Sequence, residues 1–268
     1  MPILLKNRAL LKLSGSEAKF FLQNQLSNDI EKLDETSVQL SAYCQHQGKM
    51  LVLFWVMRQG SDFILSFPDD LLDTILPRLK MFVLMSDVVI DDISNEFVQV
   101  GHIDATADGT YSINQRLAVE MVTLSDAANI EFSDRDEWDK VCIDTVLPEV
   151  VHATGEKLVP QMLNLDIDEI GVNFSKGCYP GQEVVARLHY LGKAKRRLFK
   201  FMANEPLSVG DSLYCESSRS AKASGVVISQ VKYDSEFLCL ATLEVAHKDD
   251  LITLNSADGA TLTRIEHE

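Results

Sequence analysis

The sequence predicts an α+β protein that ends in a small β-barrel. In the first part of the chain, apolar runs typical of strands are interspersed with patterns typical of helices. Around Arg196 this texture changes, and several short apolar runs follow, separated by turn residues such as Gly210-Asp211 and Asp258-Gly259. Short strands at regular spacing are typical of a small barrel. We therefore expect an α+β region over residues 1–195 and a barrel over residues 196–268.

The α+β region is expected to open with a short strand over residues 9–13 and a helix. Ser14 and Glu17 have the spacing of a capping box, which predicts that the helix begins there and extends to about residue 26. The buried face of this helix is expected to consist of Phe20, Phe21, Leu22 and Leu26.

A second helix is expected after three strands, which cover residues 38–44, 50–58 and 63–67. Pro68 suits the start of that helix, and Asp69 and Asp70 suit the positive end of its dipole. The helix extends toward Leu84, with Pro77 as a kink or local break. The remaining elements are strands over residues 88–92, 97–103 and 117–122, a helix over 136–146, and barrel strands over 198–202, 212–215, 225–231, 237–242 and 262–265.

The net charge of −15 argues against a nucleic-acid partner, because a field of that sign repels phosphates. We therefore expect no direct binding of nucleic acid. One short segment stands out against this background, because it gathers Arg187, His189, Lys193, Lys195, Arg196, Arg197 and Lys200. This segment is either a solvated basic linker or an anchor for a small anionic ligand.

Cysteine usage and the lack of targeting signals indicate a cytoplasmic protein. The first seven residues show no signal-peptide pattern, and the apolar run over residues 50–57 is too short to span a membrane. The five cysteines are scattered and odd in number, which favours reduced thiols over a disulfide framework. Cys44 and His46 flank one residue, but two ligands do not make a closed metal site, and we expect no metal.

The run Lys176-Gly177-Cys178-Tyr179-Pro180-Gly181-Gln182-Glu183 is the most informative segment of the chain. Its two glycines permit backbone angles and close approaches that other residues resist. Between them a thiol can be held exposed on a turn. A plain structural turn also explains the glycines and the proline.

This run lies within a longer pattern that resembles a known family. The segment Pro160-Gln161-Met162-Leu163-Asn164-Leu165 leads to Phe174, then to the run itself, then to Ala186-Arg187, Gly192 and Lys195-Arg196. In this order and spacing the chain resembles the YgfZ family of folate-binding proteins. These proteins are related to the aminomethyltransferase of glycine cleavage and to mitochondrial iron–sulfur assembly factors. A weaker resemblance reaches the N-terminus through Gly15, Phe21-Leu22-Gln23, Asp29 and Gln47-Gly48-Lys49-Met50.

The resemblance implies a three-lobed ring. Two interleaved α+β lobes, roughly residues 1–45 plus 140–195 and residues 46–139, would bind tetrahydrofolate or a related reduced folate. The third lobe would be the barrel, with six strands. The implied function is an accessory role in the assembly or repair of iron–sulfur enzymes, with an indirect effect on tRNA modification. Assembly factors or client iron–sulfur enzymes would be the partners. The alternatives are a folate-dependent aminomethyl transferase and a scaffold module that binds no folate.

Two departures from the related aminomethyltransferases bear on the chemistry. Asp144 stands where those enzymes use a glutamate against the pterin edge, and Val146 stands where a glycine is usual. Val52 occupies roughly the place of their aspartate near the reacting nitrogen, and valine can neither take a proton nor stabilise a cation. We therefore expect that the chain is not an active aminomethyltransferase.

Cys178 is the candidate reactive group. Lys176 and Arg187 would favour its thiolate if they lie close to it. Glu183 and Arg187 have an ion-pair spacing if the segment after Gly181 is helical. The predicted folate-binding residues are Asp144, Lys176, Tyr179, Gln182, Glu183, Arg187, Lys195 and Arg196, with Trp55 and Trp138 either as walls for the pterin or as core residues.

Overall fold

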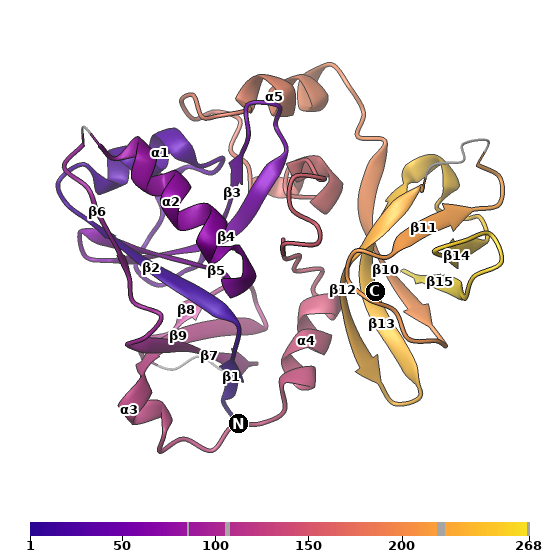
Figure 1. The fold of residues 1–268 in the computed structure, drawn as a ribbon, viewed down its shortest axis with the longest axis horizontal. Coiled ribbons are helices and arrows are strands. Elements are labelled where there is room, and N and C mark those ends of the chain that lie inside the picture. Colours follow the sequence, from indigo (N-terminus) through magenta and orange to yellow (C-terminus); the bar gives the residue numbers. More distant parts are fainter. Residues whose placement is uncertain (85, 105–107, 219–222, 267–268) are drawn as a thin grey trace.

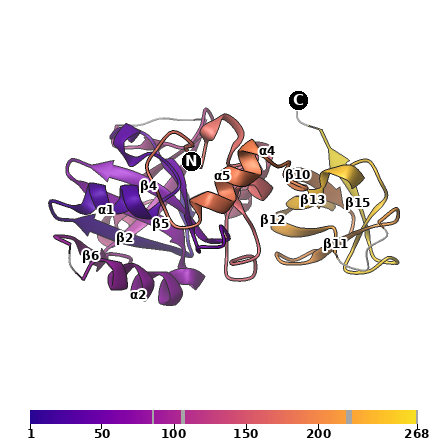
Figure 2. The same ribbon diagram turned by 90° about the horizontal axis from the view of Figure 1, so that it is seen from above.

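The computed structural model describes residues 1–84, 86–104, 108–218 and 223–266. Two sheets with helices α1 and α2 lie on one side of the molecule, the barrel lies on the other, and helix α4 lies between them (Figure 1). The view from above shows the barrel at one end of the longest axis (Figure 2). The predicted α+β class with a closed six-stranded C-terminal barrel is confirmed.

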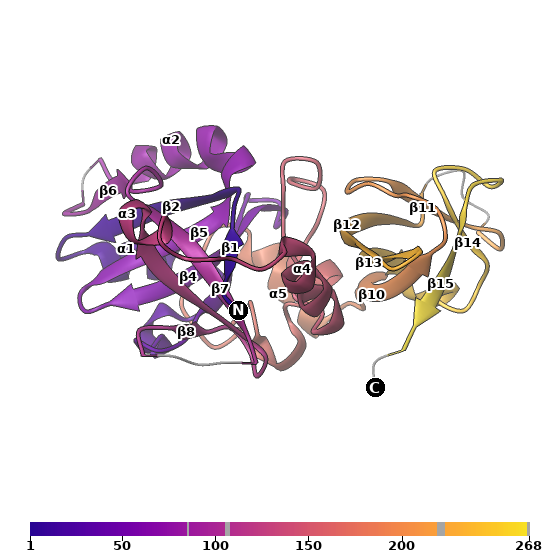
Figure 3. The same cartoon turned by 90° about the horizontal axis from the view of Figure 1, so that it is seen from below.

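The first of the two sheets has five antiparallel strands in the order β3-β4-β5-β2-β6. Its strands are β2 (Arg8–Ser14), β3 (Gln39–Cys44), β4 (Met50–Gln59), β5 (Asp62–Pro68) and β6 (Val89–Asp92). Helices α1 (Ala18–Gln25) and α2 (Leu72–Phe82) cover one face, as the view from below shows for α2 (Figure 3). Val52 and Phe54 of β4 pack toward these helices in one apolar cluster. Leu53 and Trp55 lie on the opposite face of the sheet, in a second apolar cluster that also contains residues of α4 and the barrel.

A four-stranded sheet in the order β1-β7-β9-β8 lies beside the first. It consists of β1 (Ile3–Leu5), β7 (Phe97–Ile103), β8 (Tyr111–Ser112) and β9 (Leu117–Thr123), followed by α3 (Leu124–Ala127). Strands β3 and β4 flank the lobe boundary expected between residues 45 and 46, yet they pair with each other. The division of the lobes stays a prediction, but that boundary does not follow the edge of a sheet.

The barrel contains β10 (Arg196–Ala203), β11 (Ser212–Cys215), β12 (Gly225–Tyr233), β13 (Glu236–Glu244), β14 (Ile252–Leu254) and β15 (Thr261–Ile265). The strands close in the order β10-β13-β12-β11-β14-β15. Helix α4 (Arg135–Asp144) packs against the barrel, because Trp138 and Val141 share one apolar cluster with Ile228 and Leu240. This contact joins the barrel to the rest of the core.

Helix α1 begins later than predicted, and the predicted capping box is wrong. Ser14 is the last residue of β2 and pairs with β6, so it cannot cap a helix. The N-cap residue is Glu17, and no side chain of the described residues caps this helix. The Glu17 carboxylate instead accepts the backbone N–H of Asp87. Phe20 is 68% exposed and does not belong to the buried face, which contains Phe21 and Leu22.

The other helices differ from prediction mainly at their ends. Helix α2 continues through Pro77 and ends at Phe82. The helix predicted over residues 136–146 is α4, and the Asp134 side chain caps it by accepting the N–H of Asp136. The sequence did not predict β1, β8, β14, α3 or the 3₁₀ turns η1 (Ile30–Lys32), η3 (Pro160–Leu163), η4 (Ile167–Glu169) and η5 (Val245–His247). The 3₁₀ turn η2 (Asp69–Leu71) lies at the predicted start of the second helix. Among the described residues, no helix has the length and apolar character needed to cross a bilayer.

Candidate functional site

Cys178 lies exposed on the loop of residues 176–181, which we call the cysteine loop. The other four cysteines are less accessible, since Cys44, Cys215 and Cys239 are buried and Cys142 is partly buried. Burial raises the pKa of the Cys44 and Cys239 thiols to about 12, and it also raises the pKa of Cys142. The fold therefore leaves one thiol that is available to a reagent or a partner.

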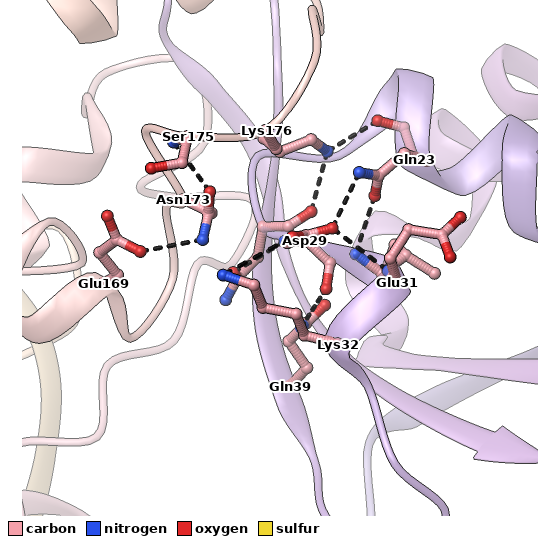
Figure 4. Close-up of polar contacts among 11 residues, drawn as sticks. Gln23, Asp29, Glu31, Lys32, Gln39, Glu169, Asn173, Ser175 and Lys176 are labelled. Carbon is pink, nitrogen blue, oxygen red and sulfur yellow. Dashed lines mark hydrogen bonds and ion pairs between the residues drawn. The ribbon is translucent and has the colours of Figure 1, made fainter.

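Lys176 holds the cysteine loop to the end of helix α1. Its Nζ donates to the backbone carbonyl of Gln23 at 2.7 Å (Figure 4), and to those of Leu26 at 2.5 Å and Asn28 at 2.8 Å. An ammonium group has three N–H donors, so these three carbonyls use all of them. Lys176 therefore has no donor left for Cys178 or for a folate, unlike the role we predicted for it. Burial lowers the pKa of Lys176 to about 8, and the negative charge of Asp29 opposes that shift.

The segment before the loop is held by a second set of polar contacts. Asn173 donates its side-chain amide to Glu169 at 2.9 Å and accepts the backbone N–H of Ser175 at 2.9 Å (Figure 4). On the opposite side, the Gln23 amide donates to Asp29 at 2.9 Å. These hydrogen bonds fix the segment that precedes Lys176 and also the backbone around Gln23 to which Lys176 binds.

The far end of the loop packs closely against the turn between β3 and β4. Gly181 has φ +84°, and a Cβ there would lie 2.4 Å from the carbonyl oxygen of Gln45 and 2.8 Å from Gly48 Cα. Gly48 itself has φ +74° and faces Val184. Gly177, in contrast, has open space around it and no positive φ, so its backbone does not require glycine. Tyr179 is buried beneath the loop, and burial raises its pKa.

Helix α5 (Gln182–Tyr190) follows the loop directly. Gln182 is partly buried, and Glu183 and Arg187 are exposed on this helix. The ion pair expected between Glu183 and Arg187 is not among the ion pairs of the described residues. The Gln161 side chain fixes the helix from below, because its amide donates to the carbonyl oxygen of Val185 at 2.7 Å.

The basic segment after α5 is divided between paired and unpaired cations. Arg196 contacts Glu244 at 3.2 Å and the carbonyl oxygen of Ala223 at 2.6 Å, and Arg197 binds Asp166 through two nitrogens. Lys195 is exposed. Arg196 therefore joins two barrel segments to each other, which is a structural role that the sequence did not predict.

Asp144 ends helix α4 and is shared by two lysines. Its carboxylate accepts Lys140 Nζ at 2.7 Å and Lys200 Nζ at 2.5 Å, which joins α4 to β10. Burial would raise the pKa of Asp144, but the two lysines outweigh burial and hold that pKa below its usual range. The carboxylate that we predicted as the pterin acceptor is thus already engaged in this structure.

A cavity of about 180 Å³ lies between α4, β4 and the barrel strand β12. Trp55, Trp138, Asp139, Glu149 and Ser229 are among its lining residues. A second cavity of about 450 Å³ shares Arg135, Asp139, Glu149 and Val151 with the first, so the two adjoin. Of these lining residues, the sequence predicted only the two tryptophans. The one signal that could have indicated the others is that Pro148 and Glu149 follow the Asp144 segment, which was itself predicted to bind folate.

The polar groups of these cavities are incompletely paired. Arg8 is buried against the Trp55 ring, with its guanidinium carbon 3.8 Å from the ring centre, and it donates to Ser66 at 2.7 Å and to Glu149. Its second terminal nitrogen and the Ser229 hydroxyl have no hydrogen-bond partner among the described residues. Burial raises the pKa of Asp139, although Arg135 contacts it at 2.8 Å. Unpaired buried polar groups beside a cavity suit a polar ligand.

These residues fit a flat heteroaromatic ligand whose edge donates N–H groups. The tryptophans offer apolar walls, and Asp139 offers a carboxylate with a single ion-pair partner among the described residues. Val52 lies elsewhere, because its side chain packs into the apolar cluster beneath α1 and α2. Val52 therefore does not line this cavity, and its correspondence to the aspartate of the aminomethyltransferases stays a prediction.

The chain has an aminomethyltransferase-like fold. It is similar to the glycine cleavage system aminomethyltransferase T from Bartonella henselae, with a TM-score of 0.73 and 12% identity over 99% of this chain and 84% of that one. No family model matches the chain.

The particular relatives are YgfZ proteins. The chain is 26% identical to the tRNA-modifying protein YgfZ of Colwellia psychrerythraea, covering 93% of this chain and 86% of that protein. It is also 26% identical to the protein of the same name from Yersinia pestis, over 86% of this chain and 80% of the relative. A Haemophilus influenzae protein called uncharacterized is 28% identical over 84% of this chain and 82% of its own length. The chain is thus similar to YgfZ proteins over most of its length, and the resemblance indicated by its sequence is confirmed.

Proposed function

We propose that this chain binds a reduced folate and supports the assembly or repair of iron–sulfur enzymes, and thereby tRNA modification. The relatives named tRNA-modifying protein YgfZ and the aminomethyltransferase-like fold support a YgfZ-type role. The observation that carries the proposal is the single exposed thiol, Cys178, on a loop held by Lys176 at one end and by Gly181 at the other.

The proposed role of Cys178 follows from its exposure. One thiolate can supply a single ligand to a cluster that a second protein holds, or it can act as a nucleophile or a redox group. Lys176 acts as a positioning residue, because it fixes the loop backbone through carbonyls of a different element. Iron–sulfur assembly factors or client enzymes are therefore the proposed partners, and they would supply the remaining ligands.

The proposed folate site is the cavity between α4, β4 and β12, which both tryptophans line. A bound reduced folate would supply a carrier for a one-carbon unit. Asp139 and Ser229 would bind its pterin edge, and Trp55 and Trp138 would exclude water from the ring. Asp144 stays a predicted contact of the folate. Because Lys140 and Lys200 already bind its carboxylate, they would have to move away or bind the ligand together with it.

Titration of the purified protein with tetrahydrofolate tests this proposal. We expect saturable binding that Asp139→Asn weakens, and no transfer of a one-carbon unit, because Val52 offers no acid–base group. Asp144→Asn serves as the comparison. If only this variant weakens tetrahydrofolate binding, the pterin site is at the end of α4 and not beside Asp139. Turnover would select the transferase alternative, and the absence of binding would select the scaffold.

Direct binding of tRNA is not part of the proposal. The net charge of −15 opposes association with phosphates, and one basic segment offers few contacts. We therefore propose that the effect on tRNA passes through iron–sulfur enzymes. A gel shift at physiological salt with submicromolar, salt-dependent affinity would show the opposite.

A further inference from the structure

The C-terminal end of α5 carries an exposed aromatic and basic surface, which we call the α5 patch (His189, Tyr190, Leu191, Lys193 and Lys195). Phe174 stacks on the His189 ring with centroids 3.7 Å apart, and the Tyr190 ring stands edge-on to Phe174 at 5.9 Å. Tyr190 is nevertheless 66% exposed and Leu191 is 85% exposed. The stack therefore holds a large aromatic side chain in place without covering it.

Three of the six Arg and Lys side chains in and around this surface lack acidic partners within the described residues. Arg196, Arg197 and Lys200 are paired with Glu244, Asp166 and Asp144. Arg187, Lys193 and Lys195 are exposed, and within the described residues none of them forms an ion pair. In a chain of net charge −15, three unpaired cations beside an exposed tyrosine and leucine form a local surface of opposite sign.

We propose that the α5 patch docks an acidic surface of an iron–sulfur protein. An apolar and aromatic centre with a charged rim is the usual anatomy of a protein interface, and tyrosine is common among its anchoring residues. The cations complement acidic groups on the partner and steer its approach. The same cations are too few for tight binding of a nucleic acid.

The position of the patch relates it to Cys178. The cysteine loop precedes the first residue of α5, and the patch begins at its last turn. A nine-residue helix is about 14 Å long, so a protein seated on the patch would also reach the thiol. This inference rests on the proposed function, because that function supplies the reason for a cluster-bearing protein to approach Cys178.

Site-specific cross-linking in cells tests the patch. A photoreactive phenylalanine analogue would replace Tyr190 in the full chain, and in a matched control it would replace Tyr233, an exposed tyrosine that follows Lys232 on the barrel. We expect position 190, but not position 233, to form a covalent product with an acidic iron–sulfur protein identified by mass spectrometry. Lys193→Glu should lower that yield by about tenfold, because it places like charges together.

Other products at position 190 would overturn the proposal. A product with a second copy of this chain would identify a self-association surface. A product with a protein that is basic or holds no cluster, or no product, would remove the proposed partner. A tRNA gel shift abolished by Lys193→Glu would assign the patch to nucleic acid.

A pair of double variants separates the patch from the proposed function. Tyr190→Ser with Lys193→Glu should lower iron–sulfur enzyme activity in cells that lack the native protein, while tetrahydrofolate binding and alkylation of Cys178 are retained. Tyr233→Ser with Lys232→Glu makes the same two changes on the barrel and should leave all three readouts near the native level. Full activity of the first variant would contradict the proposal that the α5 patch docks a partner. If the native chain does not bind tetrahydrofolate, only the proposed function is contradicted.

Discussion

At the scale of single residues, the fold distinguishes Cys178 from four other thiols. Lys176 uses its donors on backbone carbonyls, so we do not expect it to make the Cys178 thiol more reactive. The other four cysteines are shielded, and burial raises the pKa of each of them. Brief treatment of the native protein with iodoacetamide near pH 7 should therefore modify Cys178 alone. Peptide mass spectrometry checks this, and modification of Cys142 at a similar rate would contradict the burial.

Lys176 is the residue whose loss should cost most at the loop. Lys176→Met keeps the apolar stem but leaves three carbonyls without their donor, and we expect the free energy of unfolding to fall by roughly 2–4 kcal/mol. Urea denaturation measures the change. Lys195→Met is the control, because Lys195 is exposed and should tolerate the same change. An equal loss of stability in both variants would mean that the three hydrogen bonds of Lys176 do not hold the loop.

Asp144 should make stability depend on acid. Its folded pKa lies below the usual value of about 3.9, so its ion pairs contribute at pH values above that value and are lost as pH falls through it toward the folded pKa. Asp144→Asn should therefore be less stable than the native chain at pH 7, and this difference should shrink at about pH 3. Urea midpoints at both pH values measure it, and a difference that grows in acid would show that the sign is wrong.

At the scale of elements, the contact between the cysteine loop and the β3–β4 turn depends on Gly181. Gly181→Ala places a Cβ against the Gln45 carbonyl at a positive φ, and we expect a loss of about 1–3 kcal/mol. Gly177→Ala is the matched control in the same loop and should change stability by less than about 0.5 kcal/mol. Thermal unfolding of the two variants compares them, and equal stability would mean that the close approach does not matter.

The same elements show how far local patterns predict structure. Five of the six barrel strands and the long strands β4 and β5 are predicted, because alternating and continuous apolar runs identify them directly, whereas the three-residue strand β14 is too short to give such a run. The start of α1 was missed because Ser14 has the chemistry of a cap but is engaged in β2, a long-range pairing that outweighs the local preference. Phe20 was assigned to the core from its spacing, although the face it occupies is exposed.

At the scale of the whole molecule, the candidate site could be predicted only in part. The cysteine loop is continuous in sequence, so its glycines and thiol identify it. The cavity is built from Trp55, Trp138, Glu149 and Ser229, which lie on separate segments that meet only through the packing of α4 against β4 and the barrel. The role of Lys176 was also missed, since nothing local indicates that carbonyls of α1 surround its amino group.

The central claim is that the exposed thiol, and not the loop alone, carries the function. The direct measurement is the activity of iron–sulfur enzymes in cells that lack the native protein and express Cys178→Ser, beside Cys142→Ser as a control. We expect Cys178→Ser to fold normally, because its side chain is exposed, but to fail to restore activity. Cys142→Ser should lose stability and keep function. Full restoration of activity by Cys178→Ser would contradict the account, because the loop would then act through its shape and not through its sulfur.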